Sequence, residues 1–473
     1  MRSASNKSEP SPDTLTLGLL VALVVGSIIG SGIFGLPQNM AAGAGAGAIL
    51  LGWVISGFGM LMLALAYQML AQRKPDLNNG VYAYAQAGDY VGFHSAWGYW
   101  VSAWIGNVGY LVAAFGTMGY FYPAFGEGNT SVAVGCASTV LWLVHALVLR
   151  GIKTAAVLNA VVTAAKVIPL LLFIFWVAMA FQPEKFHLNF WDGAGLGSLL
   201  AQVKSTMLVT VWVFIGIEGA SVYSARARRR SDVGRATVVG FLICLLLMMA
   251  VSLLSLGIFT QPELAGLKNP SMASVLEKVV GTWSSLLIYV GLIVSVGGGF
   301  LAWTLLAAES LFTPAGVMPG GLGPQSASGV PAHALWLTNA MVQLFLLLTL
   351  LSNASYLALI SLSTAMILVP YLFSASYAAR LAWQAQAEAV AARKDLSIAL
   401  LATVYCLWLL YAAGLKYLLL SALLYAPGAV VYLLARRQSS DATFTPAERL
   451  VLLGLLLLAI CAGAALASGQ LGL

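Results

Sequence analysis

Long apolar stretches alternate with short polar or Pro/Gly-rich breaks from one end of the chain to the other. Most of them are long enough to cross a bilayer as a helix, which takes about 20 residues. We count thirteen, with approximate ranges 15–41, 46–72, 87–122, 131–149, 155–181, 198–226, 234–260, 281–312, 333–351, 354–382, 397–413, 416–435 and 449–469. The pattern predicts an all-α, polytopic membrane protein with about thirteen transmembrane helices.

Charged residues are scarce, which supports the same conclusion. Of 473 residues, 23 are Lys or Arg and 16 are Asp or Glu, so charged residues make up 8% of the chain. A soluble protein has roughly 25%. Hydrophobic residues make up 60%, too many for the core of a water-soluble protein of this size. The solvent for most of the chain is therefore lipid.

The distribution of basic residues predicts an orientation. If the polar leader 1–14 is cytoplasmic, loops on that side hold 17 of the 23 Lys and Arg residues, as the positive-inside rule requires. The basic run 225–235 resembles a nucleic-acid-binding segment, but beside a helix end it is typical of a cytoplasmic loop. We expect a multi-pass protein of the cell (inner) membrane with its carboxyl terminus outside, and no nucleic-acid partner.

The first span contains a cluster of small residues. Gly30, Ser31 and Gly32 are poor helix formers, and a break here would expose N–H groups at the start of a half-helix beginning near Ile33. Such a helix N-terminus attracts a carboxylate. The alternative is close helix packing through the small residues Gly26 and Gly30, and the spacing alone does not separate these interpretations.

The sixth span contains a single acid, Glu218, between two glycines. A carboxylate at membrane depth is costly and usually faces a water-filled path or a partner charge. We interpret Glu218 as functional, with a structural hydrogen-bond role as the alternative. If the core consists of two five-helix halves, spans one and six occupy corresponding positions. Matching glycine-interrupted segments in two halves indicate the binding site of a transporter.

Polar or aromatic candidates occur in three further spans. In the third span, one helical stripe of small and polar residues could line a cavity or pack closely against another helix. It consists of Tyr99, Ser102, Ala103, Gly106 and Asn107. In the eighth span, Trp303 by itself is typical of a core or lipid-facing aromatic residue. In the tenth, Ser363 and Thr364 precede a proline.

Lys166 lies midway along the fifth span, too deep to reach water easily. It could titrate near neutral pH, act as a fixed cation, or bond to carbonyl oxygens at a helix end. Metal and haem sites are not indicated, because the four cysteines lie far apart and the four histidines are scattered near span ends. We expect no metal and no cofactor.

Six short segments form a recognisable set: GSGIFGLP (30–37), NGVYAY (79–84), WIGN (104–107), FIGIE (214–218), AWTLL (302–306) and LVPYL (368–372). Together they resemble the basic amino acid/polyamine antiporters of the amino acid, polyamine and organocation superfamily, nearly end to end. The thirteenth span and three further stretches are most similar to the arginine/ornithine-exchanging members. Those stretches are 208–216, 333–340 and 416–421.

The resemblance implies a LeuT-like fold, in which two inverted five-helix repeats form a core with the substrate at mid-membrane. The chain would then divide into the cytoplasmic leader 1–14, a first repeat 15–181, a second repeat 198–382, and peripheral helices eleven to thirteen in 397–473. Two loops depart from the family. The loop at residues 88–89 is shortened, and 313–328 lacks the charges usual in that segment.

The resemblance also implies how the two ends of the substrate backbone would be held. The amides around Ser31 and Gly32 would bind its carboxylate. The carbonyl groups near Ile28, Trp212 and Ile215 would bind its α-ammonium group. Both sets of groups belong to the interrupted helices.

The family's remaining roles concern the substrate side chain and the gate. Trp303 would stack on the side-chain cation, while spans three and ten would supply the rest of the pocket. These positions are Ser102, Ala103, Asn107, Ser363 and Thr364. Tyr99, Trp212 and Glu218 would form the outer gate. Lys166 would stand where sodium-coupled relatives bind sodium, which removes the need for that ion.

The function implied is secondary active transport that exchanges arginine for ornithine without net charge movement. The alternatives are proton-coupled uptake of a basic amino acid, through Glu218 or Lys166, and another exchange pair: lysine/cadaverine, ornithine/putrescine or arginine/agmatine. An enzyme would need paired catalytic groups at membrane depth, which the spans do not offer. The expected partners are cationic amino acids and the lipid bilayer, and a homodimer is one candidate assembly.

Overall fold

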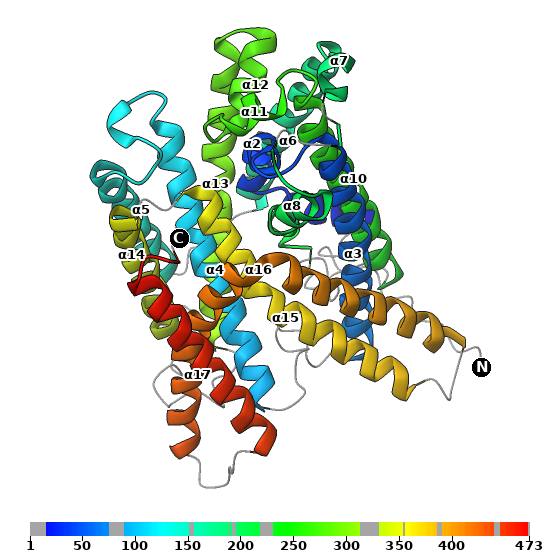
Figure 1. The fold of residues 1–473 in the computed structure, drawn as a ribbon, viewed down its shortest axis with the longest axis vertical. Coiled ribbons are helices and arrows are strands. Elements are labelled where there is room, and N and C mark those ends of the chain that lie inside the picture. The colour runs from blue at the N-terminus through cyan, green and yellow to red at the C-terminus, as the bar shows by residue number, and fades with distance from the viewer. Residues whose placement is uncertain are drawn as a thin grey trace, which may run out of the picture.

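The computed structural model describes residues 16–74, 89–150, 156–188, 190–191, 195–217, 230–312, 331–352, 355–385, 390–438 and 445–471. Within these ranges every regular element is a helix (Figure 1). The first half contains α1 (Leu17–Ile28), η1 (Ser31–Gly35), α2 (Leu36–Ala41), α3 (Ala46–Arg73), α4 (Asp89–Met118), η4 (Pro123–Phe125), α5 (Ser131–Leu149), α6 (Ala156–Met179) and α7 (Pro183–His187). The second half contains α8 (Leu199–Phe214), α10 (Arg230–Ser255), α11 (Gln261–Ala265), α12 (Ser271–Val280), α13 (Trp283–Phe312), α14 (Ala332–Ser352), α15 (Tyr356–Gln384), α16 (Val390–Gln438) and α17 (Pro446–Ala467).

Each predicted apolar stretch contains a helix, so the all-α membrane fold is confirmed. Among the described residues, nine helices are long and apolar enough to cross a membrane, or ten if the bent pair at the start of the chain is one span. The long α16 joins two helices at Gly414, whose φ of 74° is not helical. Predicted spans eleven and twelve divide at this point. The number of crossings and the division into two repeats stay predictions.

The first span is broken, but not where we expected the second half to begin. Helix α1 ends at Ile28, Gly30 is extended with φ −110° and ψ −158°, and η1 starts at Ser31. The half-helix therefore begins at Ser31 and not near Ile33, because a 3₁₀ turn forms directly after Gly30. The two halves differ in direction by 53°. Of the two interpretations of this cluster, the structure favours an interrupted helix.

Polar side chains hold the second half of the broken helix against α11 and α12. Gln38 Nε2 donates to the carbonyl oxygen of Ala265 at 3.2 Å, and Asn269 Nδ2 donates to Asn39 Oδ1 at 3.0 Å. The backbone N–H of Gln38 donates to Ser271 Oγ at 3.0 Å. These hydrogen bonds hold α2 in place. The preceding turn at Gly30 and Gly32 borders the interior cavity.

The end of α8 lies beside the break in α1. After Phe214 the chain turns, and Gly216 adopts a φ of +109°. A Cβ at position 216 would lie 2.7 Å from the carbonyl oxygen of Ser27. Glycine is needed here for both reasons, since other residues rarely adopt this φ. Glu218 follows two residues later and lies outside the described residues.

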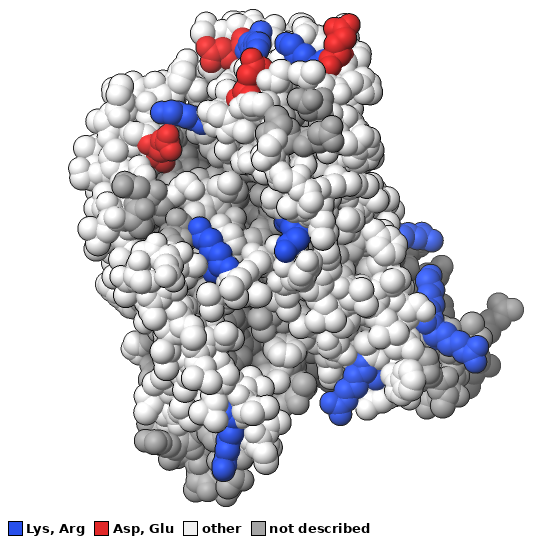
Figure 2. Space-filling model, in the orientation of Figure 1, with Lys and Arg blue, Asp and Glu red and all other residues white. Residues whose placement is uncertain are grey.

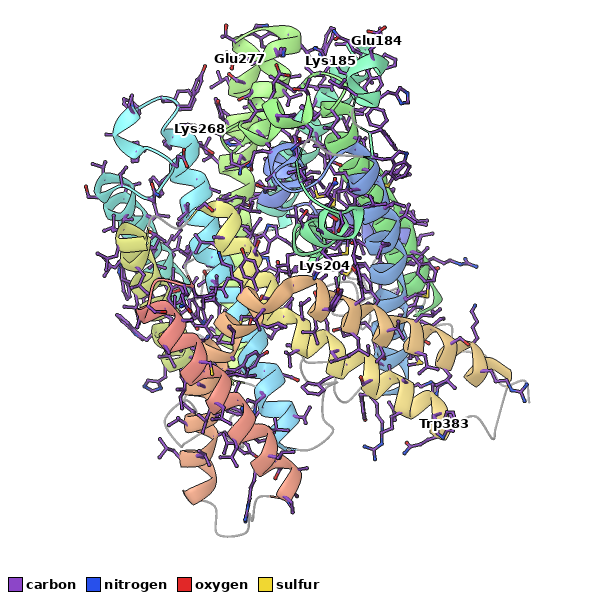
Figure 3. The ribbon with its side chains drawn as sticks, in the orientation of Figure 1. Glu184, Lys185, Lys204, Lys268, Glu277 and Trp383 are labelled. Atoms are coloured by element: carbon purple, nitrogen blue, oxygen red, sulfur yellow. The ribbon has the colours of Figure 1, made fainter. Side chains whose placement is uncertain are left out.

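Acidic side chains lie in the upper part of the face shown in Figure 2, whereas basic side chains also lie across its middle and lower parts. Lys204 is near the centre in Figure 3. In Figure 3, Glu184, Lys185 and Glu277 lie at the top, where α7 and α12 are found. Most of the surface in Figure 2 is white. Many large apolar side chains of the described residues are exposed, Leu246 of α10 by 65%. An apolar surface of this kind suits contact with lipid. Which end faces the cytoplasm stays a prediction.

Candidate functional site

The break between α1 and η1 borders a cavity inside the bundle. Besides the break, α4, α8, α13 and α15 contribute to its wall. The lining residues are Ser27, Ile28, Gly30, Gly32, Ser102, Ala103, Gly106, Tyr110, Trp212, Val213, Ile215, Trp303 and Ser363. None of these described residues is charged. The structure thus brings eight of the predicted site residues together around one space.

Helix ends supply partial charges of both signs to this cavity. The N–H groups that begin η1, around Ser31 and Gly32, have no acceptor within their own helix. The last carbonyl groups of α1, near Ile28, lack intrahelical donors in the same way. At the end of α8, the carbonyl oxygen of Trp212 accepts from the N–H of Ile215 at 3.3 Å. Aligned peptide dipoles make the first set partly positive and the second set partly negative. A molecule that carries both a carboxylate and an ammonium group matches this arrangement.

The indole of Trp212 covers the start of η1. A Cβ at Gly32 would lie 2.7 Å from Trp212 Cδ1 and Nε1, so only glycine leaves room for the ring. Gly106 of α4 supports the opposite edge, where a Cβ would lie 3.1 Å from Trp212 Cη2. The ring centre of Tyr110 lies 6.0 Å from that of Trp212. Gly32, Gly106 and Tyr110 therefore surround this ring in the conformation of this structure.

The cavity is nearly closed in this structure. Its volume is about 20 Å³. That is room for about one water molecule. Side chains must therefore move before an amino acid with a long side chain can occupy the site, and the rings of Trp212 and Trp303 are the largest groups in its wall.

Hydroxyl groups join α4 and α15 at the polar side of the cavity. Ser363 Oγ donates to the carbonyl oxygen of Ser102 at 2.7 Å, and the two hydroxyl oxygens lie 3.3 Å apart. Both serines line the cavity as predicted. Thr364 does not, because its hydroxyl donates to the carbonyl oxygen of Ile360 within α15 at 2.7 Å.

Asn107 is fully buried between α4 and α13, behind the cavity wall. Its Nδ2 donates to Thr304 Oγ1 at 3.2 Å. Its Oδ1 has no hydrogen-bond partner among the described residues. A buried acceptor without a partner is costly, so a donor from a bound molecule would be favourable here.

Two predicted residues contact the site from behind. The ring centres of Tyr99 and Trp303 lie 6.4 Å apart, with 33° between the ring planes. Ser31 Oγ and the hydroxyl oxygen of Tyr356 are hydrogen-bonded at 3.5 Å. Neither Tyr99 nor Ser31 is among the described residues that line the cavity. Tyr99 contacts the lining residue Trp303, and Ser31 lies in the chain between the lining residues Gly30 and Gly32.

Lys166 lies outside the cavity but contacts the same broken helix. Its side chain is 6% exposed, and its Nζ donates to the carbonyl oxygen of Gly26 at 3.4 Å. The contact with a carbonyl near a helix end is one of the three roles that the sequence left open. The cation at this position lies close to the last turn of α1, where the helix dipole is negative.

Comparison with known proteins identifies the family of this chain. The family model for amino acid permeases matches residues 15–435. The chain belongs to the amino acid permease family. This finding confirms the resemblance to the amino acid, polyamine and organocation superfamily.

Three relatives resemble this permease over nearly its whole length. An arginine/ornithine antiporter of Pseudomonas aeruginosa is 53% identical, with 98% of this chain and 100% of that protein aligned. A putative arginine/ornithine antiporter of Escherichia coli is 44% identical, over 94% of this chain and 97% of that protein. An L-lysine transport protein of Corynebacterium glutamicum is 43% identical, over 97% of this chain and 96% of that protein.

Several lining residues of this permease were not among the predicted site residues. Ser27, Gly30 and Val213 adjoin predicted positions in the chain. Tyr110 continues the stripe of α4, since it follows Gly106 by four residues, and a longer stripe would have included it. Tyr356 lies far from Ser31 in sequence, and the residue pattern gave no signal for their contact.

Proposed function

We propose that this permease exchanges arginine for ornithine across the cell membrane by alternating access around the central cavity. The observation that carries the proposal is the cavity at the helix break, where helix ends of both polarities and an indole ring border one space. The names of the relatives from Pseudomonas aeruginosa and Escherichia coli support this substrate pair. Both substrates carry a carboxylate, an α-ammonium group and a side-chain cation.

In the bound state the N–H groups around Ser31 and Gly32 hold the carboxylate, and the carbonyl groups near Ile28, Trp212 and Ile215 hold the α-ammonium group. The side-chain cation stacks on Trp303, which is half-buried at the cavity wall. Its far end donates to polar groups on α4 and α15. These are Ser102, Asn107 and Ser363, with Ala103 filling the wall between them.

Trp212 acts as the movable part of the gate, together with Tyr99 and Glu218. The indole lies across the start of η1 in the nearly closed cavity. When it swings away, the N–H groups become accessible to a carboxylate. Lys166 supplies a fixed cation next to α1, so that no sodium ion is required at that position.

The exchange is electroneutral because arginine and ornithine carry the same net charge. Counterflow tests the substrate pair: vesicles loaded with arginine, ornithine, lysine, agmatine or putrescine are compared for uptake of labelled arginine. We expect strong uptake with internal arginine or ornithine and weak uptake with agmatine or putrescine. Equal stimulation by agmatine would contradict the proposed pair.

Proton-coupled uptake of a basic amino acid is the second candidate. The buried ammonium group of Lys166 favours it, since a group that can lose its charge could move a proton. The name of the L-lysine transport protein of Corynebacterium glutamicum supports a basic amino acid as the substrate. Glu218→Gln and Lys166→Met variants separate the candidates, because exchange that keeps its pH profile in both excludes a proton carried by these groups.

The same proposal places the protein in the cell inner membrane, with a cytoplasmic amino terminus and an external carboxyl terminus, and includes a homodimer. Reporter fusions after residue 473 test the orientation, since an enzyme that is active only outside the cytoplasm should be active there. Activity of a cytoplasm-specific reporter at that end would contradict it.

Cross-linking of the purified protein at low concentration tests the dimer.

A further inference from the structure

A second cleft lies between α3, α10 and α16 and shares no lining residue with the central cavity. Helix α3 packs against both α10 and α16, at the right of the bundle in Figure 1. The cleft is open to the outside, and its volume is about 500 Å³. Its size and access suit a molecule that approaches from the membrane or its surface.

The lining changes in character along the three helices. One end of the cleft lies where α3 finishes and where α10 and α16 start, and the residues there are polar or charged. They are Gln72, Arg235, Lys394 and Asp395. The residues about one turn further into the bundle are apolar. They are Leu65, Val238, Val239 and Ile398. The cleft is therefore amphipathic along its length.

Positive charge exceeds negative charge at the polar end. Asp395 is paired with Arg73 at the end of α3. Arg235 and Lys394 form no ion pair with any described residue, and both side chains are exposed. Two cations of the described lining are thus available to a ligand, while Asp395, the carboxylate among the described lining residues, already has a partner.

The floor of the cleft is built by a close contact between α3 and α10. A Cβ at Gly234 would overlap the side-chain amide of Gln68, so glycine at this position lets the amide lie against α10. Gln68 lines the cleft between its charged and apolar ends. It adds a hydrogen-bonding group next to Arg235, which follows Gly234 in the chain.

We propose that this cleft binds an anionic phospholipid, with the phosphate group at Arg235 and Lys394 and an acyl chain along the apolar end. Arg and Lys form charge-assisted hydrogen bonds with phosphate oxygens, and basic pockets between membrane helices are suited to anionic headgroups. An amphipathic cleft that opens toward lipid favours a headgroup with its chain over free phosphate, because free phosphate would leave the apolar wall unused.

Native mass spectrometry of the full-length permease in detergent tests the proposal. Phosphatidylglycerol and phosphatidylcholine with the same acyl chains are titrated into wild type, the double variant Arg235→Gln/Lys394→Gln, and Arg393→Gln. The last is the matched control, because Arg393 is exposed next to Lys394 and does not line the cleft.

We expect wild type to prefer phosphatidylglycerol, and the double variant to bind it about 30-fold more weakly, since each basic residue near the surface is worth about a fivefold factor. Arg393→Gln should bind as wild type does. Retained counterflow and an unchanged melting temperature show that the double variant is folded. Equal lipid affinity in the double variant would overturn the proposal. Displacement of the lipid by millimolar inorganic phosphate would also overturn it, in favour of a free-phosphate site.

Discussion

The central cavity and the cleft between α3, α10 and α16 present opposite kinds of surface to a charged ligand. The described residues that line the cavity carry no charge, whereas the cleft offers Arg235 and Lys394. A charged side chain deep in the membrane costs several kcal/mol, while at the helix ends water and headgroups solvate it. The depth of a site therefore determines which groups can bind a charged ligand. Helix dipoles and aromatic rings do so inside the bundle, and charged side chains do so at its surface.

This comparison has a consequence for selectivity. A site made of helix ends and rings binds groups at fixed positions, so its specificity depends on a few close contacts. A surface site made of two long cationic side chains tolerates many geometries, and its affinity falls with salt. Substitutions in the cavity should thus change which molecule is transported, while substitutions in the cleft should change only how firmly an anion is held.

The largest effect is expected for Gly32→Ala. The added methyl group would lie 2.7 Å from the indole of Trp212, so the ring or the start of η1 must shift by a substantial part of an ångström. Misplacement of this size can cost about a hundredfold in rate. The rate of arginine exchange measures the effect. Gly297→Ala is the control and should exchange arginine as wild type does, because a Cβ at position 297 meets nothing within 4 Å. Wild-type exchange by Gly32→Ala would show that Trp212 does not restrict the site.

The next effect concerns the side-chain cation. Trp303→Ala should weaken binding of arginine and of ornithine by about 1 to 2 kcal/mol, roughly tenfold, if the ring is a partly desolvated cation–π partner. Trp336→Ala is the matched control, since that ring is 50% exposed on α14, away from the cavity. Isothermal calorimetry measures both constants. Unchanged affinity in Trp303→Ala would exclude the stacking role.

A smaller effect separates the carboxylate from the rest of the substrate. Tyr356→Phe removes the hydroxyl that bonds to Ser31 beside the amides of η1, at a typical cost of about 1 kcal/mol, roughly fivefold. Arginine should lose this affinity, while agmatine, which lacks the carboxylate, should not. Tyr371→Phe on the same helix serves as the control. An equal loss for both ligands would place Tyr356 away from the carboxylate.

The smallest effect is expected outside both regions, at the exposed start of α11. The Glu263 carboxylate accepts hydrogen bonds from Thr260 N at 2.8 Å and from Thr260 Oγ1 at 2.9 Å, which lowers the pKa of Glu263. Because the pKa of Glu263 is lower in the folded state, the ionised carboxylate stabilises the fold at pH values above the usual pKa of Glu. This stabilisation is lost as the pH falls through the pKa of Glu263 in the folded state. Glu263→Gln should lower the melting temperature by about 2 °C or less at pH 7, and by less at acidic pH. A larger loss at acidic pH would contradict this sign.

Much of the fold and part of the site could be predicted because both depend on local pattern. Apolar length locates the helices, and three poor helix formers in succession locate the break at Gly30. The stripe on α4 correctly brings Ser102 and Ala103 to the cavity, since helical periodicity is a local property.

Other features depend on contacts between distant segments, which a residue pattern does not contain. The half-helix begins at Ser31 because a 3₁₀ turn closes there, and its geometry is fixed by packing against Trp212. Thr364 turns its hydroxyl to its own helix, and Tyr356 reaches Ser31 across the bundle. The sequence did not reveal the basic cleft either, because Arg235 of α10 and Lys394 of α16 come together only in the folded chain.

Exchange is tested most directly by uptake of labelled arginine into vesicles that contain the purified permease. Vesicles loaded with ornithine should take up arginine many times faster than vesicles loaded with buffer alone, and an imposed membrane potential should leave the rate unchanged. Uptake that is equally fast without internal substrate, or that follows the potential, would contradict electroneutral exchange of arginine for ornithine.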